Sequence, residues 1–477
     1  MRDLLKIRYN LIMVRTRAAI SPTGYPHIGT IYQVLFDYAF AHRHKGKFIV
    51  RIEDTDKERT VADAEEKVFK ALDWFNLIED ESVRKKGLFG PYRQSDRLDI
   101  YKGHAQELID KNKAYYCFCS KDRLDEMRQK LQKEGKPPMY DKRCLKLDKK
   151  TIEQKLTKSE PYVIRLNVPN DKKIKIKDEL RGEIVFDSNS VDDQVLLKSD
   201  GYPTYFLAVV VDDHLMKISH MVRGEEWLTS SAKIVLLYEY FGWEKPVFVH
   251  TPIIRNPDRS KFSKRQGHTN VSWYQEQGFF PEVILNYLAL MGWSHPQQKE
   301  IFSLDEFIKL FDFKDINPIG PVFDLNKLEW MNGLYIRETQ NSDLKSQILN
   351  FYQKKYPEKV VEKTIPLIKE RIKKLSDYLP LCEFFFNQPH STEAVDLLSD
   401  KKELLGNIYK KLEGIKEWKA NIIGEEMMEL VKEKKMKTGE FFMILRIIIT
   451  GRKISPPLNE SMEILGKEEC LKRLTKG

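Results

Sequence analysis

Two stretches that lie far apart in the sequence combine residues that could hold a polyphosphate. The first, residues 21–30, reads SPTGYPHIGT and is followed by apolar residues at the spacing of a helix. His27 falls at the expected start of that helix, and Gly29 behind it would let a nucleotide lie close to the backbone. Because a helix N-terminus presents unpaired N–H groups and the positive end of its dipole, this junction favours an anion. The alternative is a loop histidine that only caps the helix.

The second stretch, residues 256–265, reads NPDRSKFSKR and places lysines at 261 and 264 on either side of Ser263. Proline and glycine bound this stretch, which predicts a loop rather than a helix or a strand. A basic loop that moves could close on a polyphosphate and neutralise the charge that develops as it reacts. Taken alone, the same residues favour a basic turn exposed to solvent.

A third group of residues has the chemistry of a metal site. Cys117 and Cys119 lie two apart in an extended stretch, so their side chains point to the same face. Tyr140 and Cys144 follow within 25 residues of Cys119. Three thiols and a phenol could hold a structural zinc ion. The alternative is three buried cysteines that pack as small hydrophobic side chains.

The elements around the first stretch predict a strand–helix–strand unit. Leu11–Val14 is a short apolar run of strand type, and residues 48–50 (FIV) read as a second strand after the helix. Glu53 and Asp54 come where that second strand ends, at the edge of a parallel sheet where ligands bind. The alternative role for this acidic segment is to cap a helix, for which Asp54 and Asp56 are suited.

Further along the chain, the same sheet is expected to continue. The apolar run at residues 206–211 (FLAVVV) predicts a strand covered on both faces, and residues 230–241 and 247–250 predict a helix and another strand. Residues 99–204, which begin with a helix around 100–111, therefore interrupt the sheet as an insertion. Pro281 opens a predicted helix. Two more amphipathic helices are expected at residues 401–419 and 422–437.

Composition limits the class of protein. The chain has 477 residues, 41% of them hydrophobic and 32% charged, which predicts a globular protein of three or more domains. Its net charge of +10 suits a polyanionic partner, and residues 121–150 alone carry 11 Lys/Arg against 6 Asp/Glu. The sequence has no secretory leader and no apolar run long enough to span a membrane. With an odd number of cysteines, five, it is expected to be cytoplasmic with reduced thiols.

The two phosphate-binding stretches, taken together, resemble the "HIGH" and "KMSKS" signatures of class I aminoacyl-tRNA synthetases. The flanking sequence resembles the glutamyl-tRNA synthetase family in particular. Two departures are Ile20, where relatives have proline, and Thr30, where they have a small residue; Val209 replaces an Asn that only some relatives carry. The motifs that carry the resemblance are residues 17–24 (RAAISPTG), 51–56 (RIEDTD), 200–205 (DGYPTY) and 222–227 (VRGEEW).

The resemblance implies a multidomain fold of α/β and all-α parts. A Rossmann-like catalytic domain with a parallel sheet would be split by an insertion that binds the acceptor end of tRNA. A stem-contact domain and a helical anticodon-binding domain would follow. The implied boundaries are 11–98 and 205–255 for the catalytic domain, 99–204 for the insertion with its possible zinc site, 256–330 for the stem-contact domain including the lysine loop, and 331–477 for the anticodon-binding domain.

The resemblance also implies the reaction. L-Glutamate would react with ATP, with Mg²⁺ present, to give a glutamyl-adenylate and pyrophosphate, and the acyl group would pass to the 3′ end of tRNA(Glu). His27, Lys261 and Lys264 would be catalytic. ATP would contact Thr23, Gly24, His27, Gly29, Lys261, Ser263 and Lys264. The amino acid would contact Arg17, Ala19, Ser21, Glu53, Tyr205, Arg223 and Trp227.

Several alternatives stay open at the level of sequence. Arg223 could instead form a salt bridge with Glu225 or Glu226. Some members of the family also glutamylate tRNA(Gln), and the sequence does not distinguish the two kinds. A truncated relative that modifies a tRNA base lacks the region after residue 330, and a non-catalytic RNA-binding paralogue would have lost His27 or the loop lysines. The chain is expected to act as a monomer. Some relatives carry a Cys-x-Cys…Tyr-x-x-x-Cys zinc site, which the spacing at 117–144 resembles.

Overall fold

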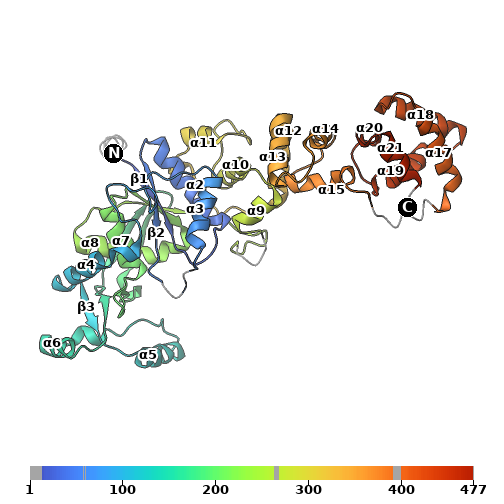
Figure 1. Cartoon of the computed structure of the whole chain (residues 1–477). Coiled ribbons are helices and arrows are strands. Elements are labelled where there is room, and N and C mark those ends of the chain that lie inside the picture. Colours follow the sequence, from blue (N-terminus) through green and yellow to red (C-terminus); the bar gives the residue numbers. More distant parts are fainter. Residues whose placement is uncertain (1–12, 57–58, 60, 263–267, 390–398, 476–477) are drawn as a thin grey trace. The chain divides into compact units, whose positions relative to one another are not determined.

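The computed structural model of the chain describes residues 13–56, 59, 61–262, 268–389 and 399–475. These residues divide into two compact units. The first comprises residues up to Ser272 together with Leu285–Phe323, and the second comprises Trp273–Ile284 and the residues from Asp324 onward. Figure 1 shows the elements in chain order.

The strand–helix–strand unit predicted near the N-terminus is present. Strand β1 (Arg15–Ile20) pairs in parallel with β2 (Lys47–Ile52), from Arg15 opposite Lys47 to Ile20 opposite Ile52. Helix α2 (Ile28–Arg43) connects them and buries Ile28, Ile31, Leu35 and Ala39. The predicted helix periodicity is therefore the buried face of α2, and α3 (Ala64–Trp74) follows β2.

The first strand lies later in the chain than the prediction. Leu11 and Ile12 are outside the described residues, and Met13 and Val14 precede β1 instead of forming it. Apolar residues predicted the strand at 11–14, but β1 includes Arg15 and Arg17, which are buried because they are paired with carboxylates. Tertiary pairing has overridden the simple apolar pattern here.

A second part of the sheet comes from residues much further along the chain. Strand β8 (His220–Gly224) pairs in parallel with β9 (Val247–Thr251), with helix α8 (Ser231–Phe241) between them. The next strand outward is β5 (Lys173–Asp178), parallel to β9, and β6 (Gly182–Asp187) pairs antiparallel with β5. The β1 backbone also bonds the residue before β8, through the Ser219 N–H to the Arg15 carbonyl at 3.0 Å. Residues 173–187 thus join the strands that flank the predicted insertion.

The strand predicted at residues 206–211 is wrong. These residues form helix α7 (Tyr205–Leu215), in which every residue from Leu207 to Asp213 is buried. A helix that is covered on all sides has a continuous apolar sequence, which is also the pattern of a buried strand, so periodicity could not separate the two. Helix α7 packs against α8 and α4 (Leu98–Asp110).

The remaining residues of the predicted insertion form a small antiparallel sheet of β3 (Ala114–Cys117), β4 (Val163–Leu166) and β7 (Val195–Leu197). Helices α5 (Lys121–Lys133) and α6 (Lys149–Thr157) lie on either side of β3 (Figure 1). Neither of these two helices buries a residue. Their side chains, rich in lysine, are therefore available to solvent or to a partner.

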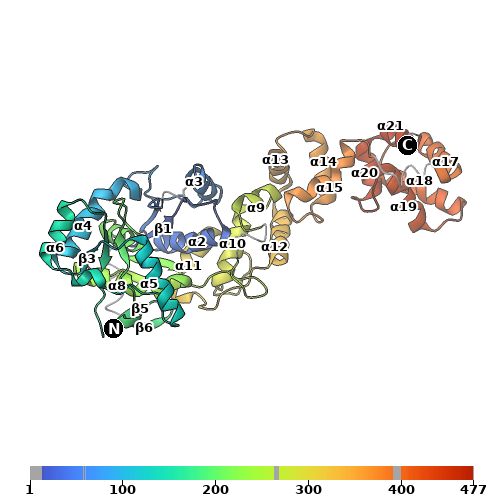
Figure 2. The ribbon, with the colours of Figure 1, turned by 90° about the horizontal axis from the view of Figure 1, so that it is seen from below.

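The described part of the second unit is built from helices and loops. Helix α10 (Pro281–Gly292) begins with the predicted proline, and α17 (Lys402–Gly414) and α18 (Ala420–Glu433) correspond to the two predicted amphipathic helices. Figure 2 shows α17 to α21 gathered at the C-terminal end around a shared apolar core. The other helices are α9 (Val271–Gln277), α11 (Leu304–Leu310, in the first unit), α12 (Leu325–Glu338), α13 (Asn341–Phe351), α14 (Glu358–Ile368), α15 (Tyr378–Cys382), α19 (Thr438–Thr450), α20 (Leu458–Leu465) and α21 (Lys467–Thr475).

None of the helices in the described residues is long and apolar enough to cross a membrane.

Candidate active site

His27 caps helix α2, and it does so inside a cavity. Its Nδ1 accepts the backbone N–H of Gly29 at 3.0 Å, and its backbone is extended, as an N-cap requires. A Cβ on Gly29 would lie 3.0 Å from that same Nδ1, so glycine permits this close approach. The capping alternative considered from sequence is therefore correct as geometry. It does not exclude a role in binding, since His27 also lines a cavity.

Two cavities of the first unit meet at the loop between β1 and α2. The smaller, of about 430 Å³, lies at the N-terminus of α2, and the larger is about 960 Å³. Ser21, Thr23, Thr30 and Gln33 line both. A ligand in one cavity would therefore lie beside a ligand in the other. This is the arrangement that a reaction between two substrates needs.

The larger cavity gathers the residues predicted to bind the amino acid. They come from four places: the end of β1, the residue after β2, the start of α7, and β8 with the 3₁₀ helix Glu225–Ser230. Each stands near the carboxyl end of a strand or the start of a helix, where parallel sheets bind ligands. The predicted residues that line this cavity are Arg17, Ala19, Ser21, Glu53, Tyr205, Arg223 and Trp227.

Arg17 is held from behind by a buried carboxylate. Its Nε lies 3.1 and 3.2 Å from the two carboxylate oxygens of Asp213, and its Nη1 donates to the carbonyl of Val222 at 2.9 Å. Burial acts to lower the pKa of Arg17, but the acidic groups around it, Asp213 first among them, together outweigh burial and the pKa is raised. The guanidinium is therefore a fixed cation in the wall of the larger cavity.

Asp37 also lines this cavity. Burial raises the pKa of Asp37 well above its usual range, and its Oδ1 has no hydrogen-bond partner among the described residues. A raised pKa lessens the negative charge of this carboxyl group and so weakens its repulsion of an anionic ligand.

Arg223 is held differently, by neutral groups. Its Nε donates to His250 Nε2 at 3.0 Å, its Nη1 donates to the Tyr205 hydroxyl at 3.2 Å, and its Nη2 donates to Ser231 Oγ. The predicted alternative of a salt bridge to Glu225 or Glu226 is wrong. Glu225 pairs with Arg181 and Arg255, and Glu226 pairs with Lys261.

Glu53 supplies an anionic group to the same cavity. Its Oε1 accepts from Arg51 Nη2 at 2.8 Å and Nε at 3.2 Å, which fixes the carboxylate at the end of β2. Arg51 is itself fully buried and donates to Asp213 at 2.6 Å. Asp54 instead accepts from the backbone and hydroxyl of Ser95. The N-cap residue of the next helix, α3, is Asp63, so Asp54 does not have the predicted role of a helix N-cap.

The smaller cavity gathers the described residues predicted to bind the nucleotide. Thr23, Gly24, His27, Gly29 and Lys261 line it together with Glu226. Lys261 Nζ lies 3.3 Å from Glu226 Oε1, and its side chain is 63% exposed. An exposed ion pair of this kind is weak, so an anion could take the lysine from it. Ser263 and Lys264 lie outside the described residues.

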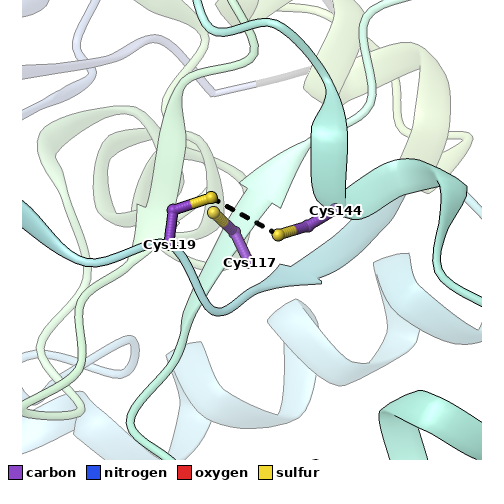
Figure 3. Close-up of side chains that lie close together, drawn as sticks. All are labelled: Cys117, Cys119 and Cys144. Atoms are coloured by element: carbon purple, nitrogen blue, oxygen red, sulfur yellow. Dashed lines mark hydrogen bonds between the residues drawn. The ribbon is translucent and has the colours of Figure 1, made fainter. Parts of the chain in front are cut away.

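The predicted metal ligands come together on the small antiparallel sheet. The Sγ atoms of Cys117, Cys119 and Cys144 lie within 4.8 Å of one another, and those of Cys119 and Cys144 are 3.6 Å apart. Figure 3 shows the three sulfur atoms turned toward one another. The Tyr140 hydroxyl is 3.4 Å from Cys117 Sγ and 3.3 Å from Cys119 Sγ. Sulfur atoms bound to one tetrahedral zinc ion lie about 3.8 Å apart, so this donor set fits zinc.

The pKa values of two cysteines in this cluster are shifted in opposite directions, which favours metal binding. A hydrogen bond from Cys144 lowers the pKa of Cys117 to about 4, and the same interaction raises the pKa of Cys144. One sulfur of the group is therefore a thiolate at neutral pH, which is the form that binds a metal.

Sequence reasoning missed the residues that hold the two arginines. Asp213 lies just beyond the apolar run at residues 206–211, and neither it nor Asp178, Ser231 or His250 belongs to a motif that the sequence reveals. Helical spacing would have revealed Asp213, because residues 205, 209 and 213 lie on one face once this segment is a helix. The signal for Asp178 and His250 is weaker, since they meet only through the pairing of β5 with β9.

Comparisons with known proteins agree with this geometry. The family described as "tRNA synthetases class I (E and Q), catalytic domain" matches residues 13–330, and "Anticodon binding domain" matches residues 340–477. The glutamate–tRNA ligase of Acidothermus cellulolyticus is 43% identical over 482 residues, covering 97% of this chain and 94% of that protein. That of Pseudomonas savastanoi pv. phaseolicola is 43% identical over 462 residues, covering 95% and 93%.

A solved structure gives the same result for the fold. The glutamate tRNA ligase from Elizabethkingia meningosepticum, in complex with its amino acid, superposes with a TM-score of 0.86 at 35% identity. The match covers 97% of this chain and 98% of that one. The fold predicted from sequence, a class I catalytic domain followed by an anticodon-binding domain, is confirmed. The chain belongs to the glutamate–tRNA ligase family of class I aminoacyl-tRNA synthetases.

Proposed function

We propose that this chain ligates L-glutamate to the 3′ end of tRNA(Glu), using ATP. The observation that carries the proposal is the meeting of two cavities at one loop. One is lined by Arg17, Arg223 and Glu53 among others, and the other lies at a helix N-terminus beside Lys261. The first suits an amino acid with an acidic side chain, and the second suits a polyphosphate.

Glutamate would bind in the larger cavity. Arg17 and Arg223 would receive the side-chain carboxylate, Glu53 would pair with the ammonium group, and Ala19, Ser21, Tyr205 and Trp227 would complete the wall. Each charge-assisted hydrogen bond contributes about 1.5–3 kcal/mol. A site built on such bonds rejects a substrate that lacks the charged group by roughly 10⁴-fold. Discrimination against glutamine therefore needs no second, hydrolytic site.

ATP would bind in the smaller cavity, with its phosphates at the mouth of α2. The glutamate α-carboxylate attacks the α-phosphorus, and pyrophosphate leaves. The protein's part is to position the reactants and to neutralise developing charge. His27 and the backbone around Thr23, Gly24 and Gly29 would hold the phosphates, and Lys261 would move from Glu226 to the departing pyrophosphate. By resemblance, Ser263 and Lys264 would assist.

Mg²⁺ fits this site because a nucleotide-bound magnesium ion needs only one or two protein carboxylates besides phosphate oxygens. Among the described residues that line the smaller cavity, Glu226 is the one with a carboxylate. The ion would supply positive charge beside the pyrophosphate. Once Lys261 has left Glu226, the carboxylate is available for such a contact.

The tRNA would contact several parts of the chain. The lysine-rich helices α5 and α6 of the insertion have no buried residues and would approach the acceptor end through phosphate contacts, which position without reading sequence. Residues 256–330 would contact the stem and residues 331–477 the anticodon. The enzyme would act as a monomer.

Zinc would be a structural ion in the insertion, held by Cys117, Cys119, Tyr140 and Cys144. Its contribution would be to fix the loops between β3 and α6, because binding energy at such a site is folding energy. Metal analysis of the purified protein checks this. One zinc per chain that is lost in Cys144→Ser supports the site, whereas no zinc in protein purified without chelators contradicts it.

The decisive experiment is charging of purified tRNA(Glu) and, separately, tRNA(Gln) with radiolabelled glutamate, ATP and Mg²⁺. We expect tRNA(Glu) to accept glutamate. Acceptance by tRNA(Gln) as well would define a non-discriminating enzyme. Failure of both tRNAs would contradict the proposal and favour a non-catalytic tRNA-binding protein.

A further inference from the structure

A buried chain of hydrogen bonds runs from strand β5 to the larger cavity. Asp178 Oδ2 lies 2.6 Å from His250 Nδ1, and His250 Nε2 lies 3.0 Å from Arg223 Nε. Ser231 Oγ lies 3.0 Å from the same His250 nitrogen and also accepts from Arg223 Nη2. Asp178, His250, Arg223 and Ser231 are each at most 5% exposed. The cavity-lining arginine is thus linked to a residue three strands away from β1.

The Asp178 carboxylate is fixed on all sides. Its Oδ1 accepts the backbone N–H groups of Leu180 and Arg181, both at 3.0 Å. Its Oδ2 accepts the backbone N–H of His250 at 3.1 Å in addition to the ring contact. A carboxylate with four such contacts has one orientation, so the imidazole bonded to it has one orientation as well.

The hydrogen bonds determine where the proton of His250 lies. A guanidinium has five N–H donors and no acceptor, so His250 Nε2 must accept from Arg223 Nε with its lone pair. The proton of the neutral ring is then on Nδ1, where it is donated to Asp178. Any proton added to Nε2 would face the Arg223 N–H directly and break the bond.

The remaining donors of Arg223 are placed for a ligand. Three of its five N–H groups are used by His250, Ser231 and Tyr205, which leaves one on each Nη among the contacts of the described residues. Arg223 lines the larger cavity, so this pair is available to it. Two parallel N–H groups match the two oxygens of a carboxylate.

We infer that His250, oriented by Asp178, is a positioning residue that aims the Arg223 fork at the side-chain carboxylate of glutamate. The inference rests on the proposed function, since it concerns the substrate of that site. His250 is buried behind Arg223 and lines neither of the two cavities described above, so it would act through the arginine. Through Asp178, the hairpin of β5 and β6 thereby contributes to the selection of the amino acid.

The groups that face His250 set the direction of a pH effect. Asp178 faces it from β5, Arg223 from β8, Ser231 from α8, and the Arg181 side chain bonds its carbonyl at 3.3 Å. Tyr205 on α7 reaches it only by way of Arg223. Burial lowers the pKa of His250, Asp178 opposes this, and Arg223 reinforces it. The ring is therefore neutral at pH 7, and Arg223 loses its acceptor only as the pH falls below the ordinary histidine pKa of about 6.5.

Two substitutions separate positioning from a general structural role. In His250→Gln the amide oxygen can still accept from Arg223, but the link to Asp178 is lost. In His250→Asn the shorter amide can still donate to Asp178, but it does not reach Arg223. We expect the KM for glutamate to rise about tenfold or more in His250→Asn and by less than about threefold in His250→Gln. The KM for ATP should stay within about twofold in both.

The test measures charging of tRNA(Glu) by the full chain with each substrate varied in turn, across pH 5–8. Wild type should lose kcat/KM for glutamate at the acid end, and His250→Gln should lose this dependence. His295→Asn is a matched control, because His295 is a buried histidine that pairs with Glu306. It should leave the KM for glutamate unchanged.

The outcomes are distinguishable. If wild type charges no tRNA with glutamate, the proposed function is wrong. If wild type charges tRNA but His250→Asn raises the KM for ATP as much as that for glutamate, or if His250→Gln is affected as strongly as His250→Asn, the positioning role is wrong. An unchanged acid limb in His250→Gln would also contradict it.

Discussion

Arg17 and Arg223 line the same cavity, but their charges are compensated differently. Arg17 is paired with the Asp213 carboxylate, whereas the hydrogen-bond partners of Arg223 among the described residues are neutral. A buried cation without an anionic partner is costly. Glutamate would supply the missing negative charge, so the protein should be more stable with glutamate bound than with glutamine.

Replacing Arg223 with lysine keeps the charge but removes the planar fork. We expect Arg223→Lys to lower kcat/KM for glutamate by about 10²-fold or more, because lysine cannot keep three fixed contacts and still offer two donors. Steady-state charging of tRNA(Glu) measures this. Arg84→Lys is the control, because Arg84 pairs with Asp73 and Glu79 and lines neither cavity. A loss of less than threefold in Arg223→Lys would remove Arg223 from the substrate site.

Lys261 is expected to act on the leaving group. Its ion pair with Glu226 is exposed and so is worth at most about 1 kcal/mol. Lys261→Ala should slow adenylate formation, measured as ATP–pyrophosphate exchange with tRNA present, by about 10²-fold. The Kd for tRNA should change by less than about threefold. Lys70→Ala, which removes an exposed lysine of α3 that lines neither cavity, is the control. Equal losses of exchange and of tRNA affinity would contradict the assignment to pyrophosphate.

At the scale of elements, helix α7 shows what the sequence could and could not predict. The strand–helix–strand unit around His27 was predictable because its motif is contiguous and its helix alternates buried apolar residues with partly exposed positions such as Thr30 and Gln33. Helix α7 was mistaken for a strand because it is covered on all sides and has no polar face. Its acidic residues carry information only through partners elsewhere: Asp213 meets Arg17 and Arg51, and Asp212 meets Arg97.

Only part of the site could be predicted from the sequence, because some of its residues have partners that lie far away in the chain. Glu53, Tyr205 and Trp227 lie in motifs that can be recognised locally, and they do line the predicted cavity. His250 and Asp178 lie in an ordinary strand and in a hairpin whose pairing the sequence did not reveal. A one-dimensional pattern identifies residues that face the ligand more readily than residues that hold them in place.

Asp213 of α7 forms ion pairs with Arg17 of β1 and Arg51 of β2. Asp213→Asn would leave the buried guanidiniums of Arg17 and Arg51 without part of their compensation. We expect the free energy of unfolding of the first unit to fall by about 3–5 kcal/mol. Chemical denaturation followed by circular dichroism measures this. Asp99→Asn, whose side chain is 98% exposed, should change little. An Asp213→Asn protein with wild-type stability would mean that the network is not needed for folding.

At the scale of the whole molecule, the order of domains was predictable, but the division between the compact units was not. Residues 273–284 belong with the chain after residue 324, although they lie among residues of the first unit in sequence. The Phe280 N–H donates to Asn332 Oδ1, and the Leu375 N–H donates to the Gly278 carbonyl. Helix α10 therefore has residues in both units.

This division predicts where the chain can be shortened. A fragment that ends at residue 323 loses Asn332 and Leu375, so Phe279 and Phe280 should lose part of their burial. A fragment that ends at residue 386 keeps both partners. We expect the shorter fragment to melt at least roughly 5 °C below the longer one. Calorimetry of both fragments measures this. Equal melting temperatures would mean that residues 273–284 do not depend on the later residues.

The strands of the catalytic domain lie far apart in the sequence, which has a consequence for folding during synthesis. Strand β1 is synthesised first, but β8 and Asp213, which its backbone and Arg17 contact, follow about 200 residues later. At about 5–20 residues per second, the ribosome makes that interval in roughly 10–40 s. During this time Arg17 of β1 lacks its carboxylate partner, because Asp213 has not yet been made. Strand β1 therefore cannot join the residues that lead into β8 until those residues have been synthesised. In that interval the incomplete sheet of the nascent chain is a substrate for a chaperone.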